Sequence, residues 1–198
     1  MKGVIIFLFV LLLSFFAGEL ILRILGFESL HYESFKLKSD KRDYLIPDSI
    51  NGFGLRKGVF NVDLNGLKYK ATHSSSGNRV TFPVQNKGIK VGMFGCSFTY
   101  GMGVNDSNTS SSNLQSLNPN LSITNYGVPG FGNVQTYYQI EKIIKSNTEL
   151  DVAIINFCDF HLERNVMSPV FRKHLNLGFE QNLYKNQFST SYLPFVTI

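Results

Sequence analysis

The feature that most constrains the fold is a repeated succession of strand, loop and helix signals that begins after Gly88. Each expected strand is a short apolar run, and each expected helix follows a loop rich in glycine or polar residues. The strands are expected at residues 89–94, 121–126 and 151–157, and the helices at residues 106–117 and 134–146. Continuous apolar runs are typical of parallel strands that are covered on both faces. The pattern therefore predicts an α/β domain with three layers (α/β/α), in which a parallel sheet lies between helices.

The loops that follow the three expected strands indicate where a site would lie. They cover residues 95–103, 127–132 and 158–165, and ligands of open parallel sheets bind at the carboxyl ends of the strands. All three loops are therefore expected at one edge of the sheet. On the second expected helix, the side chains of Val134, Tyr137, Tyr138 and Ile144 are expected on roughly one side.

The N-terminus carries a second strong signal, an uncharged apolar run from Gly3 to Gly18 that continues to Phe27. A helix over about 20 apolar residues covers the ~30 Å hydrocarbon core of a bilayer. Glu19 and Arg23 are four residues apart, so they share a helix face and can pair near the interface. The run predicts a transmembrane anchor.

A cleaved signal peptide is the alternative interpretation of this run. The sequence Phe15-Phe16-Ala17 lacks the small-x-small pattern of a cleavage site, which favours the uncleaved anchor. Four basic residues follow the helix and would draw that side toward the cytoplasm: Lys36, Lys38, Lys41 and Arg42. We nevertheless expect the C-terminal domain to be extracytoplasmic, either periplasmic or at the cell surface.

The remaining segments divide the chain into three parts. Residues 1–27 are the anchor or signal segment, residues 28–87 are a linker with a small β-rich lead-in, and residues 88–198 are the α/β domain, which is expected to be incomplete at its C-terminus. His31 and His73 lie in the lead-in and are interpreted as surface residues.

Charge and cysteine content narrow the function classes. The formal net charge of +5 is spread along the chain without a dense basic run, so nucleic acid is not an expected partner. Cys96 and Cys158 have neither C-x-x-C spacing nor a four-ligand zinc set, so no metal and no cofactor are implied. If the strand order is 2-1-3, these cysteines follow neighbouring strands and a disulfide is conceivable, although two free thiols are favoured.

The first loop, GCSFTYG at residues 95–101, presents a candidate nucleophile. Ser97 comes just after a buried strand and just before a helix, where a hydroxyl is exposed and nearby backbone N–H groups are free to donate. The next glycine falls four residues after Ser97, which differs from the G-x-S-x-G turn of α/β-hydrolases. The glycines of GVPGFG also lack the G-x-G-x-x-G order of dinucleotide sites.

These loops resemble the conserved blocks of the SGNH, or GDSL-like, hydrolase family in its membrane-anchored form. GCSFTYG is similar to block I, with Cys96 where the family usually has aspartate, and NYGVPGFG at residues 125–132 is similar to block II. The resemblance implies a flavodoxin-like fold, with Ser97 as the nucleophile and the backbone N–H of Gly130 in the oxyanion hole.

Residues 151–165 resemble block III, and here the residue that aligns with the family's oxyanion asparagine is Cys158. Asp159, His161 and Asn165 are the polar residues nearby, and His161 is an alternative candidate for the base. The Asp-x-x-His block that supplies the family's base has no match after residue 166, since Phe171 stands three residues before His174. Either the sequence stops before that block or the domain has lost its base, and the first explanation is favoured.

The resemblance implies an enzyme that acts on ester bonds of acyl or acetyl groups, either as a hydrolase or as an O-acyltransferase. Its expected partners are the membrane and an acylated small molecule or carbohydrate, including carbohydrate of the cell surface. A chain without the base is expected to be a poor enzyme. The alternative from another class is a non-catalytic, membrane-tethered protein that binds glycans or serves as a scaffold.

Overall fold

The computed structural model describes residues 2–26, 37–40 and 45–166, so His31, Phe171 and His174 lie outside the described residues. The chain divides into two units, Met1–Ser34 and Phe35–Ile198. In the first unit, helix α1 (Lys2–Ile24) is apolar along its length and has no buried residue. It is long and apolar enough to cross a membrane, and a signal sequence has the same properties. Arg23 Nε lies 2.8 Å from Glu19 Oε1, which confirms the expected pair.

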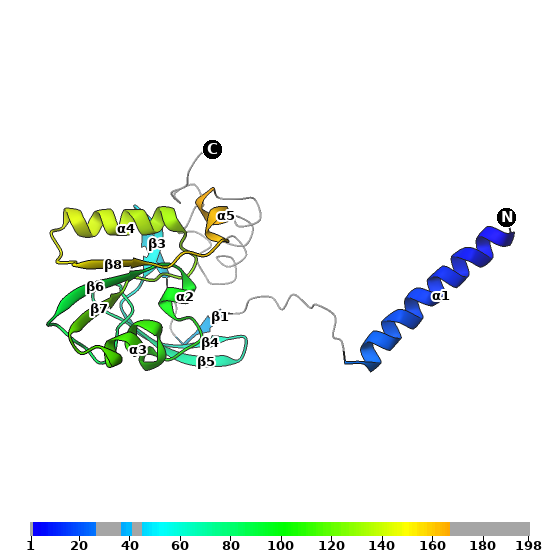
Figure 1. The fold of residues 1–198 in the computed structure, drawn as a ribbon, viewed down its shortest axis with the longest axis horizontal. Coiled ribbons are helices and arrows are strands. Elements are labelled where there is room, and N and C mark those ends of the chain that lie inside the picture. Colours follow the sequence, from blue (N-terminus) through cyan, green and yellow to red (C-terminus); the bar gives the residue numbers. More distant parts are fainter. Residues whose placement is uncertain (1, 27–36, 41–44, 167–198) are drawn as a thin grey trace. The chain divides into compact units, whose positions relative to one another are not determined.

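The second unit contains the expected parallel sheet. Its strands are β6 (Ile89–Phe94), β7 (Leu121–Asn125) and β8 (Val152–Ile155), and their order is β7-β6-β8. Both pairings are parallel. Strand β6, the first of these three strands in the chain, lies at the centre, as the expected order 2-1-3 requires. The described residues therefore confirm a mixed α/β fold with an N-terminal apolar helix and a parallel sheet of three strands (Figure 1).

The helices around this sheet differ in part from the expected ones. The segment predicted as one helix at residues 106–117 is a 3-10 helix, η1 (Asp106–Asn108), followed by α3 (Ser110–Leu117). Thr109 separates them in an extended conformation, because its side chain caps α3 by accepting a hydrogen bond from the Ser112 N–H. The loops predicted after β6 and β8 contain two short helices that were not expected, α2 (Ser97–Tyr100) and α5 (His161–Asn165).

Helix α4 (Asn133–Lys145) forms where the second helix was expected. Tyr137 and Ile144, two of the residues expected to share a side, are 61% and 67% exposed. The buried residues of α4 are Gln135, Thr136 and Ile143. Gln135 lies on the buried side because its side chain accepts a hydrogen bond from the Gly132 N–H at the start of the helix. Hydrophobic periodicity does not reveal such a role for a polar side chain.

The lead-in is built from antiparallel strands. Strands β1 (Leu37–Ser39), β4 (Gly58–Leu64) and β5 (Leu67–His73) form one sheet in the order β1-β4-β5. Strands β2 (Leu45–Asp48) and β3 (Gly52–Leu55) form a separate pair. Along β4 and β5 the buried positions alternate with exposed ones, which is typical of a sheet with one covered face.

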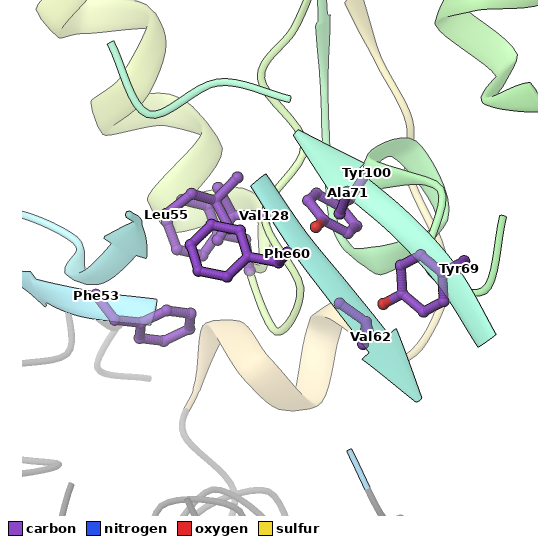
Figure 2. Close-up of a cluster of buried hydrophobic side chains, with 9 residues drawn as sticks. Phe53, Leu55, Phe60, Val62, Tyr69, Ala71, Tyr100 and Val128 are labelled. Carbon is purple, nitrogen blue, oxygen red and sulfur yellow. The ribbon is translucent and has the colours of Figure 1, made fainter. Parts of the chain in front are cut away.

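The covered face of the lead-in packs on the loops that follow β6 and β7. Figure 2 shows side chains from both regions gathered in one hydrophobic cluster. Phe53, Phe60 and Tyr69 come from the lead-in, whereas Tyr100 belongs to α2 and Val128 to the loop after β7. The lead-in and the parallel sheet therefore share a core at the edge where the candidate site was expected.

A buried ion pair joins the same two regions. Arg79 is 1% exposed, and its Nε donates to Asp106 Oδ1 at 3.2 Å. Its two terminal nitrogens donate to the backbone carbonyls of four residues, namely Tyr100, Gly101, Lys70 and Val104. All five guanidinium N–H groups thus have acceptors, which offsets the cost of burying the charge.

His73 is a core residue, and its interpretation as a surface residue is wrong. The side chain is 3% exposed, its Nδ1 lies 2.7 Å from the Arg56 carbonyl oxygen, and its Nε2 lies 2.8 Å from the Tyr100 hydroxyl. Burial is the main cause that lowers the pKa of His73, to about 4. The imidazole is therefore neutral at pH 7, and it reaches the interior because both ring nitrogens have partners there.

Candidate functional site

Ser97 is the first residue of α2, and two residues, Gly95 and Cys96, separate it from the end of β6. Its carbonyl oxygen accepts hydrogen bonds from the N–H groups of Gly101 and Met102, at 3.0 and 2.9 Å. These backbone hydrogen bonds stabilise the turn that carries Ser97. The residue is half-buried, and its hydroxyl has no hydrogen-bond partner among the residues that the structure describes. A serine hydroxyl without a structural partner is available for chemistry.

The loop after β7 packs directly on this turn. The N–H of Val128 donates to the carbonyl of Gly95 at 3.0 Å, and Asn125 donates through its side chain to the carbonyl of Thr99 at 2.9 Å. A Cβ on Gly127 would lie 2.8 Å from the carbonyl carbon of Thr99, so only glycine allows this approach. The first two loops thus meet at one edge of the sheet, as the sequence predicted.

Gly130, the predicted oxyanion donor, lies in the same loop with a φ of +90°. A side chain there would meet the ring of Phe53, at 3.2 Å from Cβ. The hydrogen bonds between this loop and the Ser97 turn are made by Asn125 and Val128 instead. Gly130 therefore occupies the part of the loop that faces the lead-in.

The loop after β8 reaches the Ser97 turn through Asn156, which the sequence had not indicated as a site residue. Its N–H donates to the carbonyl of Phe94 at 2.9 Å, continuing the pairing of β6 and β8. Its side chain donates to Thr99 Oγ1, also at 2.9 Å. An amide at the end of an apolar strand was the available signal, but Cys158 had been aligned with the family's asparagine.

Two of the predicted polar residues have structural hydrogen bonds. Asp159 is exposed, and its carboxylate accepts from the Phe160 N–H at 2.8 Å. Asn165 Oδ1 accepts from the N–H groups of Asn133 and Val134, at 2.8 and 3.4 Å. Asn165 thus caps the first turn of α4 from a distant part of the chain, which satisfies donors that a helix leaves unpaired.

His161 is buried, with 1% exposure, at the start of α5. Its Nδ1 lies 3.1 Å from Asn133 Oδ1 and 3.4 Å from the backbone nitrogen of Cys158. Its Nε2 is buried and has no hydrogen-bond partner among the described residues. Burial, and then the charge of Arg164, lower the pKa of His161, so the ring is neutral near pH 7. No hydrogen bond joins His161 to Ser97 within the described part of the chain.

Cys96 and Cys158 lie close to His161, and both are free thiols. Their sulfur atoms and one ring nitrogen of His161 all lie within 4.8 Å of one another. Burial, and then the neighbouring Cys96 thiol, raise the pKa of Cys158. The sequence predicted neighbouring strands for the two cysteines only if the strand order was 2-1-3, and the observed order β7-β6-β8 meets this condition. The histidine becomes part of the group only through the turn that opens α5.

A cavity of about 700 Å³ lies apart from Ser97. It is bounded by the β2–β3 pair, by residues 75–78 and by α4, and Tyr126, Val128 and Phe131 line it from the loop after β7. Three basic side chains contribute to its lining, namely Arg56, Lys57 and Lys142. Such a cavity is large enough to hold a small ligand.

No protein-family model matches this chain, and no curated protein matches it significantly. The functional conclusion therefore rests on the arrangement of residues. Within the part of the chain that the structure describes, that arrangement offers a serine hydroxyl without a hydrogen-bond partner at the carboxyl end of the central strand and two loops packed around its turn.

Proposed function

We propose that the chain is an SGNH-type serine hydrolase or O-acyltransferase that acts on acyl esters, including those of cell-surface carbohydrate, through Ser97. The observation that carries the proposal is the position of Ser97, which starts a helix directly after the central parallel strand with no partner for its hydroxyl within the described residues. In this proposal, α1 tethers an extracytoplasmic domain to the membrane.

The chemistry proposed is attack of Ser97 Oγ on the ester carbonyl, with release of the alcohol and transfer of the acyl group to water or to a sugar hydroxyl. The backbone N–H of Gly130 would stabilise the oxyanion. Among the described residues, His161 does not supply the base in this proposal, because it is buried and its Nδ1 is engaged by Asn133.

The three-layer arrangement of the family belongs to the same proposal. In its support, α3 packs against β7, and α3 and α4 are drawn on opposite sides of the parallel strands in Figure 1. Cys96 in place of aspartate and Cys158 in place of asparagine are departures from the family pattern. The first departure adjoins Ser97 in the sequence and the second lies close to Cys96 in the fold, and neither replaces Ser97 itself.

A fluorophosphonate probe tests the nucleophile directly, because it forms a covalent bond with activated serine hydroxyls. We expect the probe to modify Ser97 in the full chain, as mapped by peptide mass spectrometry, and the Ser97→Ala variant to lose the modification. Ser110→Ala is the matched control, since Ser110 is an exposed serine at the start of α3.

Labelling that persists in Ser97→Ala, or that never exceeds the labelling of heat-denatured protein, would contradict the proposal. Hydrolysis of an activated acetyl ester provides a second readout. It should fall to the uncatalysed rate in Ser97→Ala and stay unchanged in Ser110→Ala.

The cavity near α4 favours a second candidate function, a non-catalytic glycan-binding protein, because Ser97 does not line it and basic side chains do. Binding of acidic oligosaccharides, measured by calorimetry, should then weaken at least tenfold in Lys57→Ala. Lys87→Ala is the control, because this exposed lysine is outside the cavity. Binding that is equal in both variants, or absent in the wild type, would exclude this function.

A further inference from the structure

The cluster of Cys96, Cys158 and His161 is formed by two neighbouring strands and one turn. Pairing of β6 with β8 continues through the hydrogen bond from the Asn156 N–H to the Phe94 carbonyl, and this places the segments that carry the two cysteines side by side. The His161 N–H donates to the Cys158 carbonyl at 2.9 Å, which closes the turn and brings the imidazole to the thiols.

The ligand atoms of this cluster are placed as a metal site requires. A tetrahedral zinc site with Zn–S of about 2.3 Å and Zn–N of about 2.0 Å separates its ligand atoms by roughly 3.5 to 3.8 Å. The three atoms here lie within 4.8 Å of one another, so their separations would shorten by at most about 1.3 Å on binding. Cys158 is half-buried, which leaves a path for an ion to enter.

His161 supplies a second and independent observation. It is among the most buried side chains of the described residues, and its Nε2 has no hydrogen-bond partner. A buried polar atom without a partner carries a desolvation penalty and calls for a ligand. Nδ1 lies 3.1 Å from Asn133 Oδ1 and 3.4 Å from the Cys158 backbone N–H, and one hydrogen on Nδ1 serves only the first of these contacts. The tautomer that donates from Nδ1–H to Asn133 and gives up the longer contact with Cys158 leaves Nε2 unprotonated, and such a hydrogen bond typically orients a histidine that binds a metal.

We propose that Cys96, Cys158 and His161 bind one Zn²⁺ ion, with a fourth coordination position open to water or another small ligand. Two thiolates and one imidazole are a ligand set that zinc accepts. Binding requires both thiols to lose their protons to solvent, and the two thiolates then neutralise the charge of the ion.

Among the described residues, Arg164 and Asp159 are the charged groups that act on this cluster, and Arg164 also acts on His161. The Arg164 guanidinium lies within hydrogen-bonding range of the Cys96 thiol and donates to the Phe131 carbonyl at 2.8 Å. A positive charge disfavours a bare cation, but an N–H donor to sulfur stabilises the thiolate that the ion needs. The site can be tested separately from the proposed serine chemistry, because none of its three ligands is Ser97 or Gly130.

Cobalt titration of the reduced full chain tests the site, since Co²⁺ replaces Zn²⁺ and gives a thiolate-to-metal absorption band. We expect one equivalent of Co²⁺ to produce this band and one equivalent of Zn²⁺ to abolish it. Cys158→Ser and His161→Ala should each weaken Co²⁺ binding at least tenfold, by analogy with the loss of one ligand. Ser97→Ala should keep the band and lose only the fluorophosphonate label, which separates the two proposals.

Three results would overturn the metal site. They are the absence of a thiolate-to-metal band in reduced wild-type protein, equal Co²⁺ affinity in the wild type and in Cys158→Ser, and air oxidation of the reduced thiols to a Cys96–Cys158 disulfide at the same rate with and without Zn²⁺. The wild-type titration does not depend on the folding of any variant. Circular dichroism of each variant shows whether a lost band reflects a lost ligand or an unfolded chain.

Discussion

At the scale of single residues, buried polar side chains determine much of how distant segments of this fold pack together. His73 is held neutral between the Arg56 carbonyl and the Tyr100 hydroxyl, and it thereby joins β5 to α2. Sequence alone placed this histidine on the surface, because a lone histidine in a polar lead-in has no local signal of burial. Its partners come from distant segments, and only they make its burial favourable.

The low pKa of His73 predicts that stability falls in acid. The folded pKa is about 4 and the unfolded pKa is near 6.5, so the unfolded chain binds more protons between these values. The contribution is fully present above about pH 6.5 and is lost as the pH falls toward 4, by on the order of 3 kcal/mol. Urea unfolding from pH 7 to pH 4 measures it.

His161, whose pKa is also lowered, should contribute in the same direction. In His73→Gln the slope of stability against pH should therefore decrease without vanishing. An unchanged slope in this variant would show that His73 does not titrate in this range.

The loop after β7 approaches α2 closely at Gly127, and this gives a testable prediction. A Cβ at this position would collide with the backbone of Thr99 and Tyr100, whereas a Cβ at Gly54 has a nearest neighbour at 3.9 Å. We expect Gly127→Ala to lower the free energy of unfolding by about 1–3 kcal/mol, as for overpacking in a core. Gly54→Ala should change it by less than about 1 kcal/mol, because it adds no clash. Urea denaturation of both variants decides, and equal effects would contradict the packing of the loop on α2.

The elements show which parts of the fold local signals can predict. The three parallel strands were found close to their observed bounds, because short apolar runs separated by glycine loops are a strong pattern. The short helices α2 and α5 were missed, since helices of four and five residues leave no hydrophobic period. The start of α4 also depends on a residue that is remote in sequence, Asn165.

Capping of α4 by Asn165 gives a prediction for this element. Asn165→Ala removes the acceptor for the Asn133 and Val134 N–H groups, and we expect a loss of about 1 kcal/mol in stability. Asn113→Ala is the matched control, because Asn113 is an exposed asparagine within α3. Thermal unfolding followed by circular dichroism compares the two. A more stable Asn165→Ala variant would show that the cap does not form.

At the scale of the whole molecule, contacts between the lead-in and the edge of the parallel sheet join the described parts of residues 35–166. Arg79 is central to this arrangement. Its backbone pairs with His73 of β5 and with Asn125 of β7, and its side chain binds Asp106 and four carbonyl groups. The Ser97 turn is therefore held by the lead-in as well as by the parallel sheet.

This role predicts a large effect for Arg79→Met. The substitution leaves Asp106 buried without its cation, and breaking a buried pair typically costs about 3–5 kcal/mol. Lys87→Met, at an exposed lysine, should have little effect. Urea denaturation measures the difference. If Arg79→Met unfolds at the wild-type midpoint, the guanidinium does not join the two regions.

The apolar helix, the parallel strands and the common edge of their loops can all be predicted from the amino-acid sequence, because they depend on local hydrophobic patterns and on the geometry of parallel sheets. The burial of His73 and Arg79, the contact of Asn156 with the Ser97 turn, and the approach of His161 to Cys96 and Cys158 become visible only in the folded chain. The physical reason is that a polar side chain becomes favourable in the interior only when specific partners satisfy it. Those partners lie far away in the chain and leave no periodic signal.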